Sequence, residues 1–175
     1  DDELHTLIER ARSLLGAPDF VAPADARAVG EETVGANAAT FKARYIAIDP
    51  VSGRLFLSDM HRVLSWPSAA GFRNGESADI AIGQRDLVSN SCNAPGLGAS
   101  SLCNPRDVAV DPQGRLYVAD GLNNRVLRFD APYSTGMAAS RVFGQNGSFI
   151  ANQPNDPGIG AGTMASPSGI AVNGE

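Results

Sequence analysis

Residues 104–130 read NPRDVAVDPQGRLYVADGLNNRVLRFD, and this stretch decides the fold. Three short runs of mainly branched and aromatic residues, 108–110, 116–119 and 126–129, are separated by two segments of Pro, Gly, Asn and Asp. Branched and aromatic residues favour strands, and the residues between them favour tight turns. The stretch therefore predicts a small antiparallel sheet and an all-β fold.

The pattern repeats along the chain. It occurs at 42–66 as KARYIAIDPVSGRLFLSDMHRVLSW and begins again at 166–175 as SPSGIAVNGE. Asp49, Asp111 and Asn173 occupy the same place in the three copies, because 111 − 49 = 62 and 173 − 111 = 62. A strand-containing repeat of this length is typical of propeller blades. The 175 residues thus hold 175/62, or about 2.8, repeats.

A second landmark closes each copy: Gly83-Gln84 and Gly144-Gln145 each follow a short apolar run. This run is predicted to be the fourth, outer strand of a four-stranded blade. The predicted strands are 45–48, 55–58, 62–66 and 79–82 in the first blade, and 107–110, 116–119, 125–129 and 141–143 in the second. Residues 11–15 align with the outer strands and are expected to form a strand. Residues 1–10 stay undecided, because the apolar spacing over 4–15 also fits a short amphipathic helix.

These residues resemble an NHL repeat. The resemblance rests on 105–111 with its Ala-Val-Asp ending, Gly114, Leu-Tyr-Val-Ala-Asp at 116–120 and Asn-Arg-Val at 124–126. The first copy departs from it, since its Met60-His61 turn is two residues shorter and His61 stands where the second copy has Asn124. The resemblance, which is greatest to bacterial proteins with long blades, implies a β-propeller of about six blades that serves mostly as a binding platform.

The repeats divide the chain into alternating blades and loops. They are a tail and preceding outer strand at 1–20, a loop at 21–40, a blade at 41–87, a loop at 88–103, a blade at 104–149, a loop at 150–165 and the first strand of a further blade at 166–175. Six blades would need about 6 × 62 = 372 residues, so the ring is incomplete. The open edges predict either a segment of a longer propeller or several chains that complete one another.

Composition excludes several kinds of partner. The formal net charge is −5, and the single lysine, Lys42, belongs to no basic cluster, which argues against binding to nucleic acid. No apolar run approaches the ~20 residues of a membrane span. Low lysine with abundant Ala, Gly and Arg favours a bacterial source.

The two cysteines, Cys92 and Cys103, bracket one Gly- and Ser-rich inter-blade loop. A disulfide that closes a loop of this length stabilises a protein by about 3 kcal/mol. We expect this bond rather than two free thiols, because neither cysteine has a metal or nucleophile motif beside it. A disulfide in turn indicates an extracellular or periplasmic location.

Two acidic residues at the ends of the second strands, Asp59 and Asp120, are each followed by an arginine, Arg62 and Arg125. Each carboxylate can pair with its arginine and accept turn N–H groups, fixing the hairpin. Because the pair recurs in each blade, we expect a structural role and not a catalytic one.

The expected function is a non-enzymatic scaffold that binds a protein partner or self-associates through its open blade edges. Loops carry function on rigid frames, and the inter-blade loops are long and polar. Candidate surface contacts are Arg44, Arg106, His61, Phe149, Ile150 and Met164, although a purely structural or solvated role explains them equally well. The alternative is part of a six-bladed lyase or lactonase, whose metal site would be completed by other blades. The chain offers only His5 and His61 for such a site, so no cofactor is expected.

Overall fold

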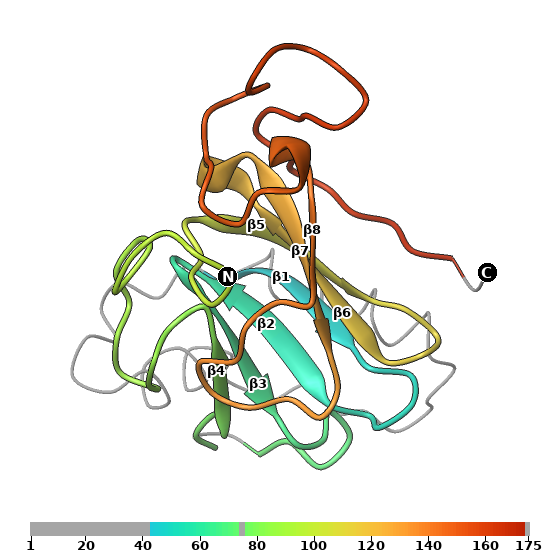
Figure 1. Cartoon of the computed structure of the whole chain (residues 1–175). Coiled ribbons are helices and arrows are strands. Elements are labelled where there is room, and N and C mark those ends of the chain that lie inside the picture. Colours follow the sequence, from blue (N-terminus) through green and yellow to red (C-terminus); the bar gives the residue numbers. More distant parts are fainter. Residues whose placement is uncertain (1–42, 74–75, 174–175) are drawn as a thin grey trace.

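The computed structural model describes residues 43–73 and 76–173. They form two antiparallel sheets of four strands each, in the order β1-β2-β3-β4 and β5-β6-β7-β8 (Figure 1). The strands are β1 Ala43–Ile48, β2 Leu55–Asp59, β3 Arg62–Trp66, β4 Ile80–Ile82, β5 Pro105–Val110, β6 Arg115–Asp120, β7 Arg125–Asp130 and β8 Arg141–Phe143. Single 3₁₀ turns follow β6 (η2, Gly121–Asn123) and β8 (η3, Gln145–Gly147). The all-β prediction of four-stranded blades is confirmed.

The β5–β6 turn shows why these strands end where they do. Gly114 donates its N–H to the Asp111 carbonyl at 2.9 Å and has a φ of +73°, which an L side chain rarely adopts. The Asp111 carboxylate accepts the N–H groups of Gln113 and Arg115 at 3.0 and 2.9 Å. Asp49 does the same for Val51 at 2.9 Å in the longer turn of the first blade. The repeated aspartates are therefore turn residues.

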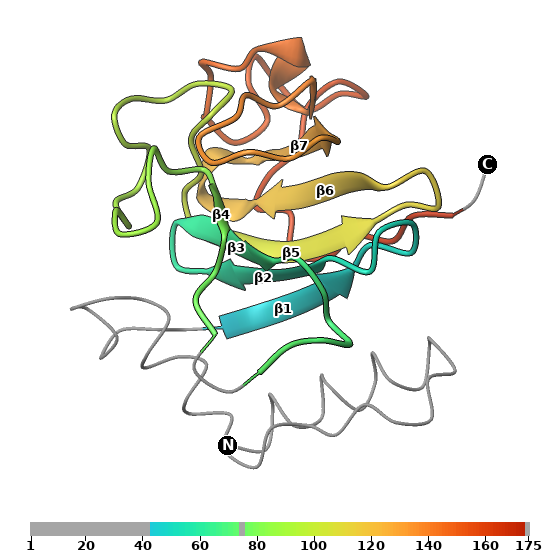
Figure 2. The ribbon, with the colours of Figure 1, turned by 90° about the horizontal axis from the view of Figure 1, so that it is seen from below.

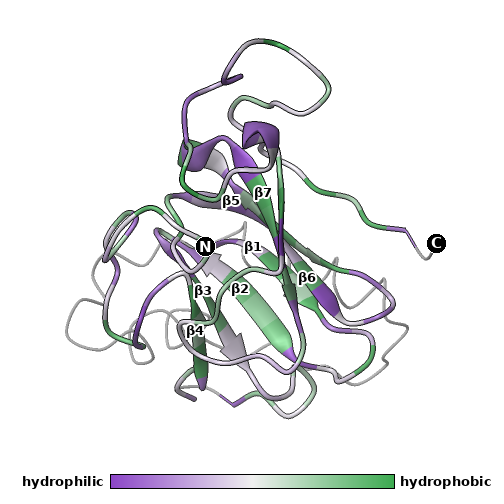
Figure 3. Ribbon diagram, in the orientation of Figure 1, coloured by the Kyte–Doolittle hydropathy of each residue, from purple (hydrophilic) through white to green (hydrophobic). Residues whose placement is uncertain are grey.

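The core lies between the two sheets, which stack with β1 and β5 side by side (Figure 2). Its buried members come from both blades and from the intervening loop: Phe56, Val63, Ile80, Ile82, Leu102, Val108, Leu116, Val118, Leu127, Phe129 and Ala139. A second cluster surrounds Trp66 on the other side of the first blade. β2 and β4 are mainly hydrophobic in Figure 3, whereas η3 is polar. Among the described residues, no helix is long and apolar enough to cross a membrane.

The third copy of the repeat differs from the prediction. Residues 166–173 contain no strand, although 166–175 was expected to be the first strand of a further blade. A strand requires a hydrogen-bonded neighbour, and no described segment pairs with this one as β6 pairs with β5. The segment nonetheless reaches β5, because the Ile170 N–H donates to the Asp107 carboxylate at 2.6 Å. The predictions for 1–20 and 21–40 lie outside the described residues.

Candidate functional site

A fully buried ion pair holds the β6–β7 hairpin. Arg125 Nε lies 2.9 Å from an oxygen of Asp120, and both side chains are fully buried. Arg125 Nη2 donates to the carbonyls of Gly98 and Ser101, both at 2.9 Å, and Nη1 donates to the Phe149 carbonyl. One guanidinium therefore ties its hairpin to the loop before the blade and to the loop after it.

The Asp120 carboxylate is held from several sides. It accepts the Cys103 N–H and the Asn123 side-chain amide, both at 2.7 Å, in addition to Arg125. Burial raises the pKa of Asp120 above its ordinary value, and the charge of Arg125 and these hydrogen bonds oppose that rise. Loss of Arg125 would leave a buried carboxyl without its counter-charge.

The first blade contains the same arrangement. Arg62 Nε lies 2.9 Å from Asp59, again with both side chains fully buried. Arg62 Nη1 donates to the carbonyls of Leu87 and Ser89 at 2.8 and 3.3 Å. Leu87 is 149 − 87 = 62 residues before Phe149, so the two arginines hold equivalent loop positions one repeat apart.

The glutamines of the Gly-Gln landmarks are buried clamps that sequence reasoning recognised only as markers. Gln84 donates through Nε2 to the carbonyls of His61 and Ser91, both at 2.8 Å. Gln145 donates in the same way to the carbonyls of Asn124 and Gln153, at 2.8 and 2.9 Å. Each amide thus joins the hairpin of its own blade to the loop that leads onward. The sequence signal for these two glutamines was the recurrence of Gly-Gln at the end of each copy.

The glycine of each landmark makes room for that loop. A Cβ on Gly83 would lie 2.5 Å from the Leu102 side chain, and one on Gly144 would lie 2.7 Å from the Met164 side chain. Both glycines also have φ values near +90°, at +89° and +86°. Met164, a candidate surface contact, therefore occupies the place of Leu102 and covers Gly144.

A repeated latch connects each hairpin to the segment that begins the next copy. The Asn104 N–H donates to His61 Nδ1 at 3.1 Å, and the Ser166 N–H donates to Asn124 Oδ1 at 2.7 Å. Asn104 and Ser166 both have positive φ, at +57° and +48°. The substitution of His61 for asparagine is therefore explained, because imidazole nitrogen and amide oxygen accept the same bond.

Sequence comparison agrees with these repeated contacts. Residues 102–129 match the family model described as NHL repeat. This stretch is an NHL repeat. Among curated proteins, none matches the sequence. The matched residues include Asp120, Asn124 and Arg125, so the recognised NHL repeat contains the buried ion pair and the acceptor of the Ser166 latch.

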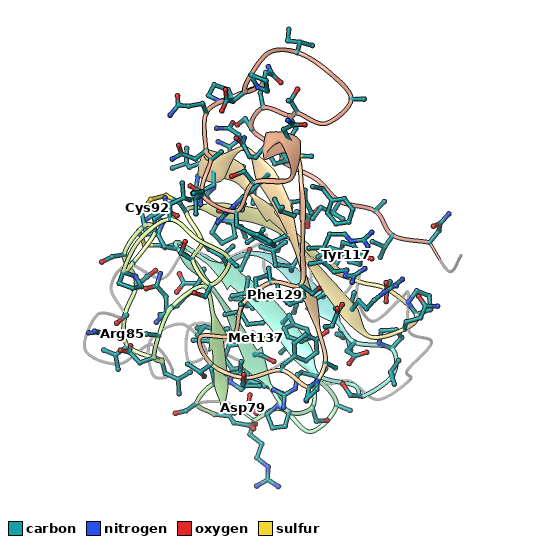
Figure 4. The ribbon with its side chains drawn as sticks, in the orientation of Figure 1. Asp79, Arg85, Cys92, Tyr117, Phe129 and Met137 are labelled. Carbon is teal, nitrogen blue, oxygen red and sulfur yellow. A yellow bond between two sulfur atoms is a disulfide. The ribbon has the colours of Figure 1, made fainter. Side chains whose placement is uncertain are left out.

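The loop between the two blades is closed by the predicted disulfide. Cys92 and Cys103 are bonded, with their Cα atoms 4.5 Å apart. Cys92 is exposed in the inter-blade loop, as Figure 4 shows, whereas Cys103 is buried. The ring of His61 lies next to this bond. The disulfide therefore closes the loop beside the latch, the hydrogen bond from the Asn104 N–H to His61 Nδ1.

The other candidate contacts fall into different environments. Phe149 is partly buried against the inter-blade core. Ile150 is strongly exposed. Arg106 donates to the Ser166 hydroxyl at 2.9 Å, and Arg44 is exposed. The two long loops also share a backbone hydrogen bond at equivalent positions. The Asn93 N–H donates to the Leu102 carbonyl, and the Asn155 N–H donates to the Met164 carbonyl, each at 3.1 Å.

The second NHL blade has an open face that sequence reasoning did not identify. Tyr117 pairs with Ala109 in the register in which Phe56 pairs with Ala47, so the two aromatics are equivalent. Phe56 is fully buried against the second blade, whereas Tyr117 is only partly buried and lies against Phe143, with ring centroids 6.1 Å apart. Figure 4 shows Tyr117 far from Cys92. The sequence signal for this face was Tyr117, a bulky aromatic residue in the last described sheet.

The pKa of His61 gives a pH-dependent prediction for the latch. Burial lowers this pKa below its ordinary value of 6.5, and the Asp59 charge partly opposes the shift. The unfolded chain therefore binds the proton first as the pH falls through 6.5, so the folded state loses stability there. In His61→Asn the latch should persist without this loss.

Urea unfolding of both proteins at pH values of about 7.5 and 5.5 measures the difference. The wild type should lose more free energy of unfolding on acidification than His61→Asn does. Carboxylates titrate in both proteins, so their contributions to the pH dependence of the free energy of unfolding cancel when the two proteins are compared. Parallel pH profiles of the two proteins would show that His61 protonation is not linked to folding.

Proposed function

We propose that the chain is a non-enzymatic assembly scaffold whose open face, defined as Tyr117, Val126, Arg128, Arg141 and Phe143, docks a second copy of the chain. The observation that carries the proposal is the repeat equivalence of this face with a packed one. In the first blade, the equivalents of Tyr117, Val126 and Phe143 are Phe56, Val63 and Ile82, which are fully buried in the inter-blade core.

A second copy is the occupant that fits best, because the chain already makes a blade-on-blade contact through the equivalent face. The open face differs from its counterpart at two places, where Arg128 and Arg141 replace Ser65 and Ile80. Aromatic residues and arginine are the types enriched at protein interfaces. Phe143 is 37% exposed, so an apolar ring on the edge strand β8 of this face remains to be covered.

The proposed location is outside the cytosol. The Cys92–Cys103 bond supports this location, because disulfides persist in oxidising surroundings.

Light scattering after size exclusion tests the assembly, because one chain has a mass of 18.2 kDa and two have 2 × 18.2 = 36.4 kDa. We expect the larger mass at concentrations of about 100 μM, a concentration at which weak dimers form. The double variant Tyr117→Ser/Phe143→Ser should have the smaller mass. Val88→Ser, which removes an exposed side chain in the inter-blade loop, is the matched control and should remain a dimer.

A wild-type mass of 18.2 kDa at every concentration would refute self-assembly. The open face would then be expected to bind a different protein. A dimer that persists in the double variant would show that association uses another surface.

A further inference from the structure

His61 and the two cysteines bring three metal-binding groups to one point. A ring nitrogen of His61 and the sulfur atoms of Cys92 and Cys103 all lie within 4.8 Å of one another. The histidine is on the β2–β3 hairpin, and the cysteines lie at the two ends of the loop that leads to the second blade. The Cys92–Cys103 bond occupies both sulfurs in the oxidised chain.

We propose that reduction of this disulfide creates a binding site for one thiophilic cation, with Zn²⁺ as the representative ion. Zinc binds thiolate at about 2.3 Å and imidazole at about 2.0–2.1 Å, which places tetrahedral ligand atoms about 3.5–3.8 Å apart. The three groups are within reach of this geometry after small side-chain movements. Two sulfurs and one nitrogen, with no oxygen ligand, suit Zn²⁺ and Cu⁺ and do not suit Mg²⁺ or Ca²⁺.

The second junction of the chain shows that the latch does not require these three residues. Positions 62 residues later carry Pro154 in place of Cys92 and Ala165 in place of Cys103, since 154 − 92 = 62 and 165 − 103 = 62. The latch residue there is Asn124, which still accepts the Ser166 N–H at 2.7 Å. Histidine thus replaces asparagine at the one described junction that also has both cysteines.

The chemistry balances with a thiol as the reductant. Two thiols reduce the Cys92–Cys103 bond to two cysteine thiols and are themselves oxidised to one disulfide. Binding of the cation then releases two protons from Cys92 and Cys103, because thiolates are the ligands. The fourth coordination position stays open for water, since three protein ligands leave one tetrahedral place.

Ligation competes with the latch. His61 Nδ1 accepts the Asn104 N–H, so a cation on Nδ1 displaces this bond directly. A cation on Nε2 requires the proton on Nδ1, which also removes the acceptor. One neutral hydrogen bond is exchanged for three metal–ligand bonds, so we expect binding to proceed and to loosen the connection between the blades.

Cobalt titration of the full 175-residue chain tests the site, because Co²⁺ gives thiolate charge-transfer absorption in a tetrahedral sulfur site. The chain is reduced with a phosphine, which is then removed under nitrogen. We expect the absorption to saturate at one Co²⁺ per reduced chain and to disappear when Zn²⁺ is added. The oxidised chain should show none. His61→Asn retains both cysteines and an asparagine latch, and should bind Co²⁺ at least about tenfold more weakly.

Two results would overturn the proposal: no thiolate absorption in the reduced wild type, or equal Co²⁺ affinity in His61→Asn. Circular dichroism of the same samples covers the case in which reduction unfolds the chain. Zn²⁺ should then refold the wild type but not His61→Asn. Binding without refolding, or refolding of both proteins, would show a flexible dithiol and no built site. The site does not depend on the open face, so Tyr117→Ser/Phe143→Ser should bind Co²⁺ as the wild type does.

Discussion

Arg125→Ala should lower the free energy of unfolding by about 3–5 kcal/mol, the range for removing one partner of a buried ion pair. The substitution leaves Asp120 buried without its counter-charge. It also removes the donors to the carbonyls of Gly98, Ser101 and Phe149, which hold the loops on both sides of the blade. Urea unfolding measures the loss, and thermal unfolding should show a decrease of roughly 6–20 °C in Tm for a chain of this size.

Arg128→Ala is the matched control, and because Arg128 belongs to the open face, both arginine variants are compared with the wild type as monomers at low concentration. Arg128 lies three residues further along the same strand and pairs with Asp130 at 3.0 Å, but both side chains are partly exposed. Exposed pairs contribute about 0–1 kcal/mol, so this variant should remain close to the wild type. A loss in Arg125→Ala as small as that in Arg128→Ala would contradict a stabilising role for the buried pair.

Phe56→Ala should cost about 3–5 kcal/mol by opening a cavity in the core between the blades. Phe56 is fully buried, and its ring meets the Tyr133 ring edge-on with centroids 4.9 Å apart. Neighbouring side chains from the second blade are fixed in their own sheet, so the cavity can collapse only in part. Hydrogen exchange should show faster opening of both β2 and β6, because the lost contacts join the two sheets.

Tyr117→Ala provides the comparison within the chain, since Tyr117 is the repeat equivalent of Phe56. Measured on the monomer at low concentration, it should cost no more than about 1 kcal/mol, because partly exposed side chains leave no closed cavity. Comparable losses in the two variants would mean that the open face is packed as tightly as the core.

Local residue chemistry predicted the blades and the disulfide. Strand runs and Asp-Pro turns specify the strands, since these signals act over a few residues. Their recurrence at a spacing of 62 residues shows that the blade repeats. The buried Gln84 and Gln145 clamps and the His61–Asn104 latch could not be derived in this way, because each joins segments that only packing brings together. The strand expected at 166–175 was wrong over 166–173 for a related reason, since a strand needs a neighbour that its own sequence does not supply.

The sequence by itself determined an NHL repeat at residues 102–129 and β-blades that recur at a spacing of 62 residues, because turn and strand propensities are local properties. Only the tertiary structure decided which of two equivalent aromatics is core and which is surface. Phe56 faces another sheet, whereas Tyr117 is at the open face of the last described sheet. Burial depends on what lies opposite a side chain. The same holds for His61, whose place beside Cys92 and Cys103 follows from the packing of one blade on the next.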